Sequence, residues 1–202
     1  MEPFDIPRPR CYNRATLNRL KGLSSVLVIY TTENPQQREV LRGKARKVTK
    51  ITPRLLAAVE EMLETMRHAN GIGLAAPQVG IRQRFFVVEL PEDEEEGLPR
   101  ETYVLFNPEI IKPQGEQVGI EGCLSIPGYV GEVARFEQVT LKALDEQGRP
   151  VRHKVDGYLA RVFQHEIDHL DGILYTDRMT DPSTFRPVTA GDEEAEELAT
   201  LA

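Results

Sequence analysis

Two stretches with the 3.6-residue apolar period of amphipathic helices flank a series of short apolar runs, and this order constrains the fold most. The first stretch predicts a helix between Thr52, a suitable N-cap, and Asn70-Gly71, which would stop it. The second predicts a helix over residues 158–170, ended by Gly172. Because the predicted strands are grouped between the helices and do not alternate with them, we expect an α+β fold.

Strand patterns fill the region between the two helices. Residues 139–144 alternate apolar and polar side chains, and the chain returns after a polar turn as residues 151–155, which predicts a β-hairpin. An apolar run at 103–106 predicts a strand that ends at Asn107-Pro108. Further short strands are predicted at 26–30 and 85–90.

Composition limits the classes of protein to which the chain can belong. With 202 residues, of which 40% are hydrophobic and 28% charged, it has the profile of one globular domain with tails. No apolar run is long enough to span a membrane, and two cysteines, Cys11 and Cys123, are too few for a disulfide framework. The net charge of −7 argues against broad binding of nucleic acids.

The distribution of charge divides the chain into three parts. Residues 1–25 are rich in Pro and Arg and show no apolar period, so we expect a basic extension there. The domain itself is expected over residues 26–182, followed by an acidic tail over residues 183–202. The N-terminus lacks the apolar segment of a signal peptide, which indicates a cytoplasmic protein and leaves an organellar form open.

The second predicted helix contains His165-Glu166-Ile167-Asp168-His169, the H-E-x-x-H pattern of helical metallohydrolase sites. Four residues of α-helix turn through about 400°, so both imidazoles lie on one face and can bind the same metal ion. Glu166 lies about a quarter-turn away, where it can reach a water beside the metal without being a ligand. The alternative is a pair of histidines on the surface of an amphipathic helix.

Two histidines do not complete a metal site, so a third ligand is required. A third histidine of the metzincin type is excluded because Tyr175 occupies its position. A glutamate from residues 193–197 would have to come from an acidic tail, which is a poor scaffold. The better candidate is Cys123 in the segment 121–125 (EGCLS), because a thiolate binds borderline and soft divalent ions strongly. The alternative for this cysteine is a buried, small hydrophobic residue.

A third segment, residues 71–78 (GIGLAAPQ), combines two glycines with other small residues, which lets its backbone approach a ligand closely. Gln78 offers a neutral amide donor at the end of the segment. No Gly-Lys-Ser/Thr follows, so the segment is not a phosphate-binding loop of the P-loop type. A tight turn after a helix is the alternative interpretation.

Together, GIGLAAPQ at 71–78, EGCLS at 121–125 and QHEIDH at 164–169 resemble the three signature motifs of the peptide deformylase family, in the family's order. The resemblance covers roughly residues 38–180. It implies a small α+β metallohydrolase in which antiparallel β-sheets pack around a central metal-binding helix, with a further helix nearer the N-terminus. It also implies a reaction, the hydrolysis of the N-formyl group from the N-terminal formylmethionine of newly synthesised proteins, which releases formate.

The resemblance further implies the roles of individual residues. Glu166 would be the general acid/base, while Gln78 and the backbone N–H of Leu124 would stabilise the oxyanion. The implied ligands of the metal ion are Cys123, His165 and His169. The residues implied to line the substrate are Ile72, Gly73 and Gly122.

Cofactor and partners follow from the same resemblance. It implies one divalent metal ion, usually Fe2+, although a Cys-His-His set also accepts Ni2+, Co2+ or Zn2+. The implied partners are nascent formyl-Met polypeptides and, transiently, the ribosome, but neither a membrane nor a specific nucleic acid. Two other classes stay open: an H-E-x-x-H endopeptidase with a glutamate as third ligand, and a metal-binding or ribosome-associated protein without turnover. The intact Gln78 and Glu166 argue against the second class.

Overall fold

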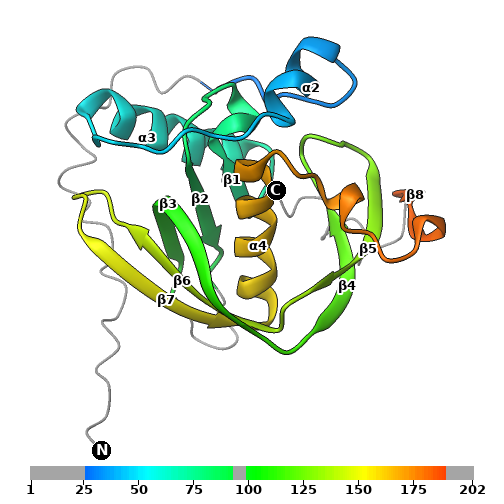
Figure 1. Ribbon diagram of the computed structural model, residues 1–202. Helices are drawn as coiled ribbons and strands as arrows, with labels where there is room; N and C mark the ends of the chain where they lie inside the picture. Colours follow the sequence, from blue (N-terminus) through cyan, green and yellow to red (C-terminus); the bar gives the residue numbers. More distant parts are fainter. Residues whose placement is uncertain (1–25, 93–98, 190–202) are drawn as a thin grey trace, which may run out of the picture.

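One helix, α4 (Gly157–Asp171), lies between two antiparallel sheets in the computed structural model, which describes residues 26–92 and 99–189 (Figure 1). The strands of the larger sheet follow the order β1-β2-β3-β6-β7, and those of the smaller sheet the order β4-β5-β8. The α+β class, with antiparallel sheets around a central helix, is therefore confirmed.

The bounds of the elements are as follows. The larger sheet contains β1 (Gly73–Ala75), β2 (Phe85–Leu90), β3 (Glu101–Gln114), β6 (Gln138–Leu144) and β7 (Pro150–Asp156). The smaller sheet contains β4 (Gln117–Gly122), β5 (Tyr129–Arg135) and β8 (Arg186–Pro187). The other helices are α2 (Pro35–Leu41) and α3 (Pro53–His68), and the short 3-10 turns are η1 (Ala76–Val79), η2 (Tyr175–Asp177) and η3 (Pro182–Thr184).

Apolar contacts attach α4 to the inner face of the larger sheet. The ring centroid of Phe163 lies 5.5 Å from that of Phe86 on β2 and 5.2 Å from that of Tyr103 on β3. Burial of a large apolar side chain stabilises the fold by about 1.5–3 kcal/mol, so this cluster fixes one side of the helix. The helix begins after Asp156 and ends at Gly172, whose φ of 76° is left-handed, so the predicted helix and its stop are confirmed.

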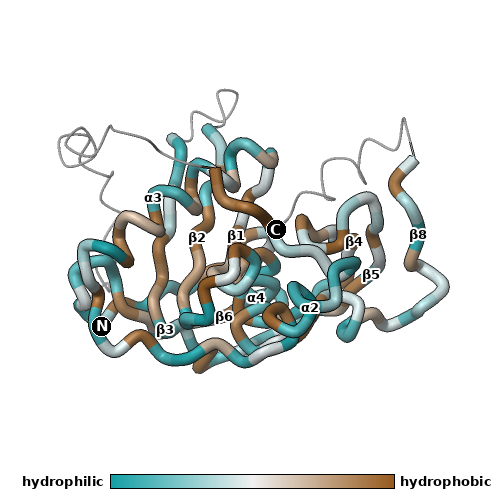
Figure 2. The backbone as a smooth tube through the Cα atoms, turned by 90° about the horizontal axis from the view of Figure 1, so that it is seen from above, coloured by the Kyte–Doolittle hydropathy of each residue, from teal (hydrophilic) through white to brown (hydrophobic). Residues whose placement is uncertain are grey.

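The opposite face of the larger sheet is covered by α3. The hydroxyl of Thr52 accepts a hydrogen bond of 3.2 Å from the N–H of Leu55, as expected of an N-cap. Met62 and Met66 belong to the apolar cluster that α3 forms with the outer face of the sheet. Figure 2 shows hydrophobic segments along the strands and on both of these helices, with hydrophilic segments in the outer loops. The predicted helix is thus confirmed, and it places the larger sheet between two helical layers.

The strand predicted at 103–106 is longer than its pattern indicates. It belongs to β3, which continues through Asn107-Pro108 with a register shift between Phe106 and Glu109. Asn107 adopts a φ of 51°, and its side chain both accepts from the N–H of Val48 and donates to its carbonyl, each at 2.8 Å. The predicted end of the strand was wrong because these two hydrogen bonds stabilise a bulge there. β3 therefore runs on toward β4 and links the two sheets.

Residues 26–30 do not form the predicted strand. The segment pairs with none of the described strands: the N–H of Leu27 donates to the hydroxyl of Thr65 at 2.8 Å and that of Tyr30 to the carbonyl of Gln78 at 2.7 Å. We call residues 26–32 the N-terminal strap. It leads into α2, a helix that the sequence did not predict, whose N-cap Asn34 accepts from two backbone N–H groups.

The remaining expectations concern the hairpin, the strand at 85–90 and the ends of the chain. The hairpin is confirmed as β6 and β7, and the strand as β2. The expected basic extension, residues 1–25, lies outside the described residues, and so does the part of the expected acidic tail from residue 190. No described helix is long and apolar enough to cross a bilayer.

Glu89 on β2 ties α3 to the sheet through charge. Its carboxylate, only 7% exposed, accepts from Arg67 on α3 at 2.9 and 2.6 Å and from the hydroxyl of Thr102 at 2.9 Å. Burial alone would raise the pKa of Glu89, but the hydrogen bonds and charge of Arg67 outweigh it and hold the pKa below 4.5. The charged form is therefore the one that stabilises the fold.

We expect Glu89→Gln to lower the free energy of unfolding by about 1–2 kcal/mol at pH 7, since water screens the half-exposed Arg67. The folded-state pKa is lowered, so the stabilisation is present above 4.5 and is lost as the pH falls through the lower folded value. Chemical denaturation at pH 7 and pH 3 measures this, and the difference in stability between the two proteins should be smaller at the lower pH. The control Glu64→Gln removes an exposed partner of Arg67 at 3.9 Å and should change stability little. If the difference in unfolding free energy between the wild type and Glu89→Gln did not change with pH, the charged form of Glu89 would not be the stabilising one.

Candidate metal centre

The two histidines of α4 face the loop that follows β4, where Cys123 lies. Nε2 of His169 lies 3.2 Å from Nε2 of His165 and 3.2 Å from Sγ of Cys123. All three side chains are buried, and their ligand atoms lie within 4.8 Å of one another. The structure therefore brings together the three residues that the sequence predicted as metal ligands.

Two of the three separations between the candidate donor atoms are close to those around a tetrahedral ion. With metal–nitrogen distances of about 2.0–2.1 Å and a metal–sulfur distance of about 2.3 Å, tetrahedral ligand atoms lie roughly 3.3–3.6 Å apart. The separations of 3.2 Å are slightly shorter but of the same size. Three protein ligands leave one tetrahedral position for water or substrate, which is typical of catalytic sites and not of structural ones.

The thiol of Cys123 needs a cation to become a good ligand. Burial raises its pKa to about 12, although the N–H of Ser125, 3.4 Å from Sγ, opposes this. A neutral thiol binds metals weakly, but a bound divalent cation deprotonates a coordinating thiol outright. The chemistry of the donor set therefore fits a divalent ion.

Glu121 orients His165 from behind the site. Its Oε2 lies 2.9 Å from Nδ1 of His165, so that Nδ1–H donates to the carboxylate and Nε2 is left to bind an ion. The carboxylate is 0% exposed, and it also accepts from Arg135 at 2.9 and 2.8 Å and from Arg161 at 2.8 Å. Burial alone would raise the pKa of Glu121, but Arg135 holds it well below its usual range. Glu121 is therefore a permanent anion behind the imidazole.

The same arginine links the network to the other acid of the H-E-x-x-H segment. Arg135 pairs with Asp168, whose oxygens also accept from Arg178 at 2.9 and 3.1 Å. Asp168 is thus a structural ion-pair partner. None of Glu121, Arg135 and Arg161 was predicted as a site residue; the signal in the sequence was an acid two residues before the motif cysteine, in an apolar context.

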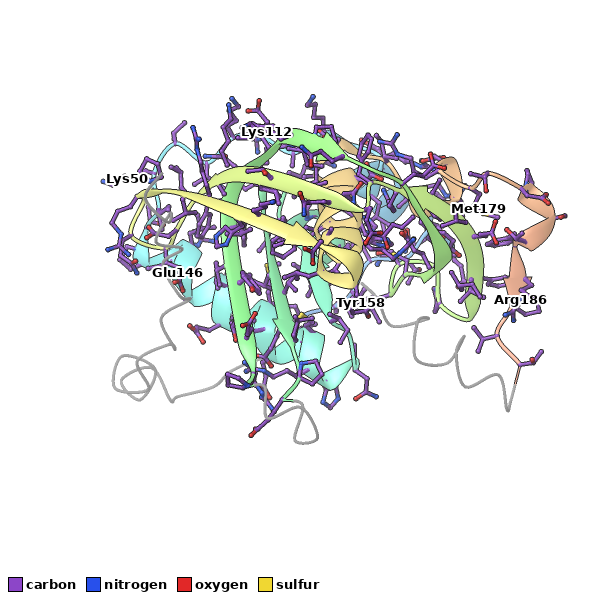
Figure 3. The ribbon with its side chains drawn as sticks, turned by 90° about the horizontal axis from the view of Figure 1, so that it is seen from below. Lys50, Lys112, Glu146, Tyr158, Met179 and Arg186 are labelled. Carbon is purple, nitrogen blue, oxygen red and sulfur yellow. The ribbon has the colours of Figure 1, made fainter. Side chains whose placement is uncertain are left out.

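Residues after α4 close one side of the site. The ring of Tyr175 stacks at 6.3 Å from that of His165, and its hydroxyl donates to the carbonyl of Tyr129 at 3.1 Å. Met179, labelled in Figure 3, lies beside β5, in contact with Gly131 on that strand. Cys123 shares a buried apolar cluster with these side chains, so the ligands face away from bulk water.

Glu166 lies fully buried at the same place. Neither of its oxygens accepts a hydrogen bond from any described residue. Burial raises the pKa of Glu166 well above its ordinary value, and the negative charge of Glu121 adds to this, while Arg135 opposes it. A Cβ at Gly73 on β1 would overlap Oε1 of Glu166, so only glycine leaves room for the carboxylate. A carboxyl whose pKa is raised by burial accepts a proton more readily than a free one, as a general acid/base requires.

Gln78 on η1 directs its amide at the cysteine. Its Oε1 accepts from the N–H of Ala75 at 2.7 Å, which fixes the orientation of the side chain. Its Nε2 lies 3.3 Å from Oγ of Ser125 and 3.7 Å from Sγ of Cys123. The buried amide therefore presents N–H groups to the site.

The remaining predicted residues lie around these groups. Gly122 ends β4 immediately before Cys123, and Leu124 contacts Gly71 at the start of the GIGLAAPQ segment. Ile72 packs partly buried against the core, next to Gly73 on β1. The structure thus brings all three sequence motifs to one place.

A family model described as Polypeptide deformylase matches residues 27–185 of the chain. The chain belongs to the peptide deformylase family. It is 49% identical to a peptide deformylase of Thermomicrobium roseum over 177 residues, covering 87% of this chain and 98% of that one. It is 54% identical to one of Symbiobacterium thermophilum over 159 residues, covering 79% and 70%.

Solved peptide deformylases share the fold. The crystal structure from Thermotoga maritima aligns with a TM-score of 0.70 and 40% identity, over 78% of this chain and 99% of that one. A structure from Synechococcus elongatus, in complex with actinonin, aligns with a TM-score of 0.71 and 38% identity, over 90% and 91%. The chain is therefore a metal-dependent hydrolase that removes the N-formyl group from the N-terminal formylmethionine of newly synthesised proteins.

We expect Cys123→Ala, His165→Ala and His169→Ala each to lose most of the bound metal, because three ligands in a fixed geometry leave none to spare. Metal-to-protein ratios after anaerobic purification measure this. Cys11→Ala, which changes the other cysteine, is the matched control and should keep its metal. A Cys123→Ala protein with full metal content and normal turnover would remove Cys123 from the site.

Proposed function

We propose that Cys123, His165 and His169 hold a single divalent ion and that Fe2+ is the resident metal. The observation that carries the proposal is the convergence of their three buried ligand atoms, within 4.8 Å of one another. A thiolate with two imidazoles also accepts Ni2+, Co2+ and Zn2+, and the family resemblance favours iron among these. When bound, the ion supplies Lewis-acid polarisation of the formyl carbonyl and of the attacking water.

The groups of the chain that stabilise charge on the formyl oxygen are Gln78 and Leu124. The amide of Gln78 is held by Ala75 with its Nε2 toward the cysteine. The backbone N–H of Leu124 follows the cysteine directly in the chain. Donors fixed in advance stabilise the oxyanion without reorganisation, and loss of one such donor typically slows the reaction about 100- to 1000-fold.

Glu166 carries the proton in both steps. It accepts the proton of the water that attacks the formyl carbon, and it then passes this proton to the leaving amine nitrogen as the C–N bond breaks and formate is released. Its burial and raised pKa support this role, because a carboxyl with a raised pKa accepts a proton more readily than a free one.

The substrate lies along β1 in this proposal. β1 is at the edge of the larger sheet and pairs only with β2 among the described strands, so its other edge can pair with an extended peptide. Ile72, Gly73 and Gly122 would line that peptide, since glycines allow close approach of the two backbones. The partners are nascent formyl-Met polypeptides, which implies action in the cytoplasm with transient contact to the ribosome.

We also propose a division of the chain into a catalytic domain over residues 26–182, a basic extension over 1–25 and an acidic tail over 183–202. The site residues all lie within 72–169, which supports the first boundary. Residues 186–187, within the proposed tail, pair with β5 as β8, so contacts with the domain extend a few residues past 182.

Release of formate from a formyl-Met peptide tests the function. We expect stoichiometric formate and free N-terminal methionine, and no cleavage of peptide bonds in the unformylated peptide. Metal analysis of the same anaerobically purified protein identifies the ion. Internal cleavage of unformylated peptides would support an endopeptidase, and stoichiometric metal without formate would support a metal-binding protein without turnover.

We expect Glu166→Ala and Glu166→Gln to keep near-stoichiometric metal while kcat falls by about 100- to 10,000-fold, the usual contribution of general acid–base catalysis. Gln keeps the shape of the side chain but cannot transfer the proton. Asp168→Asn is the control from the same segment, and since Asp168 pairs with Arg135 and Arg178, it should mainly lower thermal stability. A Glu166 variant that loses its metal would make this residue part of the metal site. One that keeps both metal and wild-type rate would exclude it as the acid/base.

A further inference from the structure

The N-terminal strap makes hydrogen bonds to both segments that carry the proposed oxyanion donors. The N–H of Tyr30 donates to the backbone carbonyl of Gln78 at 2.7 Å. The N–H of Thr32 donates to the backbone carbonyl of Ser125, the residue after Leu124, at 3.0 Å. Figure 1 shows the strap in blue, between the grey N-terminal trace and α2.

These two contacts join segments that come from different sheets. Gln78 lies on η1, which follows β1 of the larger sheet, while Ser125 lies in the loop after β4 of the smaller sheet. Tyr30 and Thr32 lie two residues apart in the chain, so the strap bonds to both carbonyls at once. The strap therefore sets the spacing between the two segments.

The strap is itself fixed along its length. Near its start, the N–H of Leu27 donates to the hydroxyl of Thr65 on α3 at 2.8 Å. Near its end, the N–H of Thr31 donates to Oε1 of Gln37 at 2.9 Å, and Nε of Arg38 donates to the carbonyl of Thr32 at 2.6 Å. Both α2 and α3 thus hold the segment in place.

The turn after Gln78 is shaped to accept the strap. Gly80 has a φ of +80°, and a Cβ there would lie 2.7 Å from the hydroxyl oxygen of Tyr30. The ring of Tyr30 therefore lies against the backbone two residues beyond Gln78, which gives the strap a second contact with the segment that carries the amide.

We propose that the strap is a positioning element for the oxyanion site, with Tyr30 and Thr32 as positioning residues. They act through the backbone of Gln78 and Ser125 and set the distance between the Gln78 amide and the Leu124 N–H. The inference rests on the proposed function of these two donors. It matters for rate because a misplacement of about 1 Å in a catalytic group can cost about 100-fold.

Removal of the Tyr30 N–H tests the proposal in the full-length, metal-loaded protein. Tyr30→Pro should lower kcat at least about 10-fold, since the Gln78 amide is no longer fixed, while KM and metal content stay within about two-fold. Tyr30→Ala keeps the N–H and measures the contribution of the ring alone. Val28→Pro is the matched control, because its N–H makes no hydrogen bond to the described residues and the side chain is 69% exposed, and it should leave kcat unchanged.

A double-mutant cycle with Gln78→Ala separates positioning from general destabilisation. If the strap acts through Gln78, Tyr30→Pro should have little further effect on kcat once the amide is absent. Additive losses in kcat would overturn the proposal and leave the strap a structural element only. A Gln78→Ala protein with wild-type kcat would instead refute the proposed role of Gln78, which is a different failure.

Thr32→Pro provides an independent test through the other carbonyl. It removes the hydrogen bond to Ser125 while leaving Tyr30 and the Gln78 contact in place. We expect kcat again to fall about 10-fold with KM unchanged, in assays kept well below the melting temperature of each variant. If Tyr30→Pro does not fold, Thr32→Pro alone tests the proposal. Wild-type kcat in a folded, metal-loaded Thr32→Pro protein would overturn it.

Discussion

The position of α4 depends on a buried carboxylate, because a helix that carries a candidate metal site buries polar groups and each of them needs a partner. Glu121 is 0% exposed and hydrogen-bonds at once to Arg135, Arg161 and His165. Removal of one partner from such a network leaves an unpaired buried charge, at a cost of about 3–5 kcal/mol. The network fixes the rotation of α4 about its axis, and with it the direction of the proposed imidazole ligands.

The other side of α4 is held by a different kind of interaction. Phe163 packs against Phe86 and Tyr103, so the helix has an apolar layer on one side and an ionic layer on the other. The proposed ligands and Glu166 lie where the two layers meet, away from bulk water. In such a medium of low dielectric constant, hydrogen bonds and charges act more strongly than in water, which favours both metal binding and proton transfer.

Local patterns predicted α3, α4 and the β6–β7 hairpin, because apolar period, caps and turns are properties of neighbouring residues. The predictions failed where contacts with residues distant in the sequence determine the structure. β3 continues past Asn107 because Val48 binds its side chain, and residues 26–30 pair with none of the strands that the structure describes. The same holds for the site. The motifs identified the candidate ligands, but the contact between Glu121 and His165 joins residues 44 positions apart and has no local signature.

The candidate ligands belong to different layers of the molecule. Cys123 follows β4 of the smaller sheet, whereas His165 and His169 lie on the central helix. An ion bound to all three is a reversible cross-link that closes a long loop of chain, as a disulfide does, and it restricts the unfolded state in the same way. Because the three ligands converge only in the folded chain, binding free energy adds to folding free energy. Loss of the ion would then loosen the junction between helix and smaller sheet before either sheet comes apart.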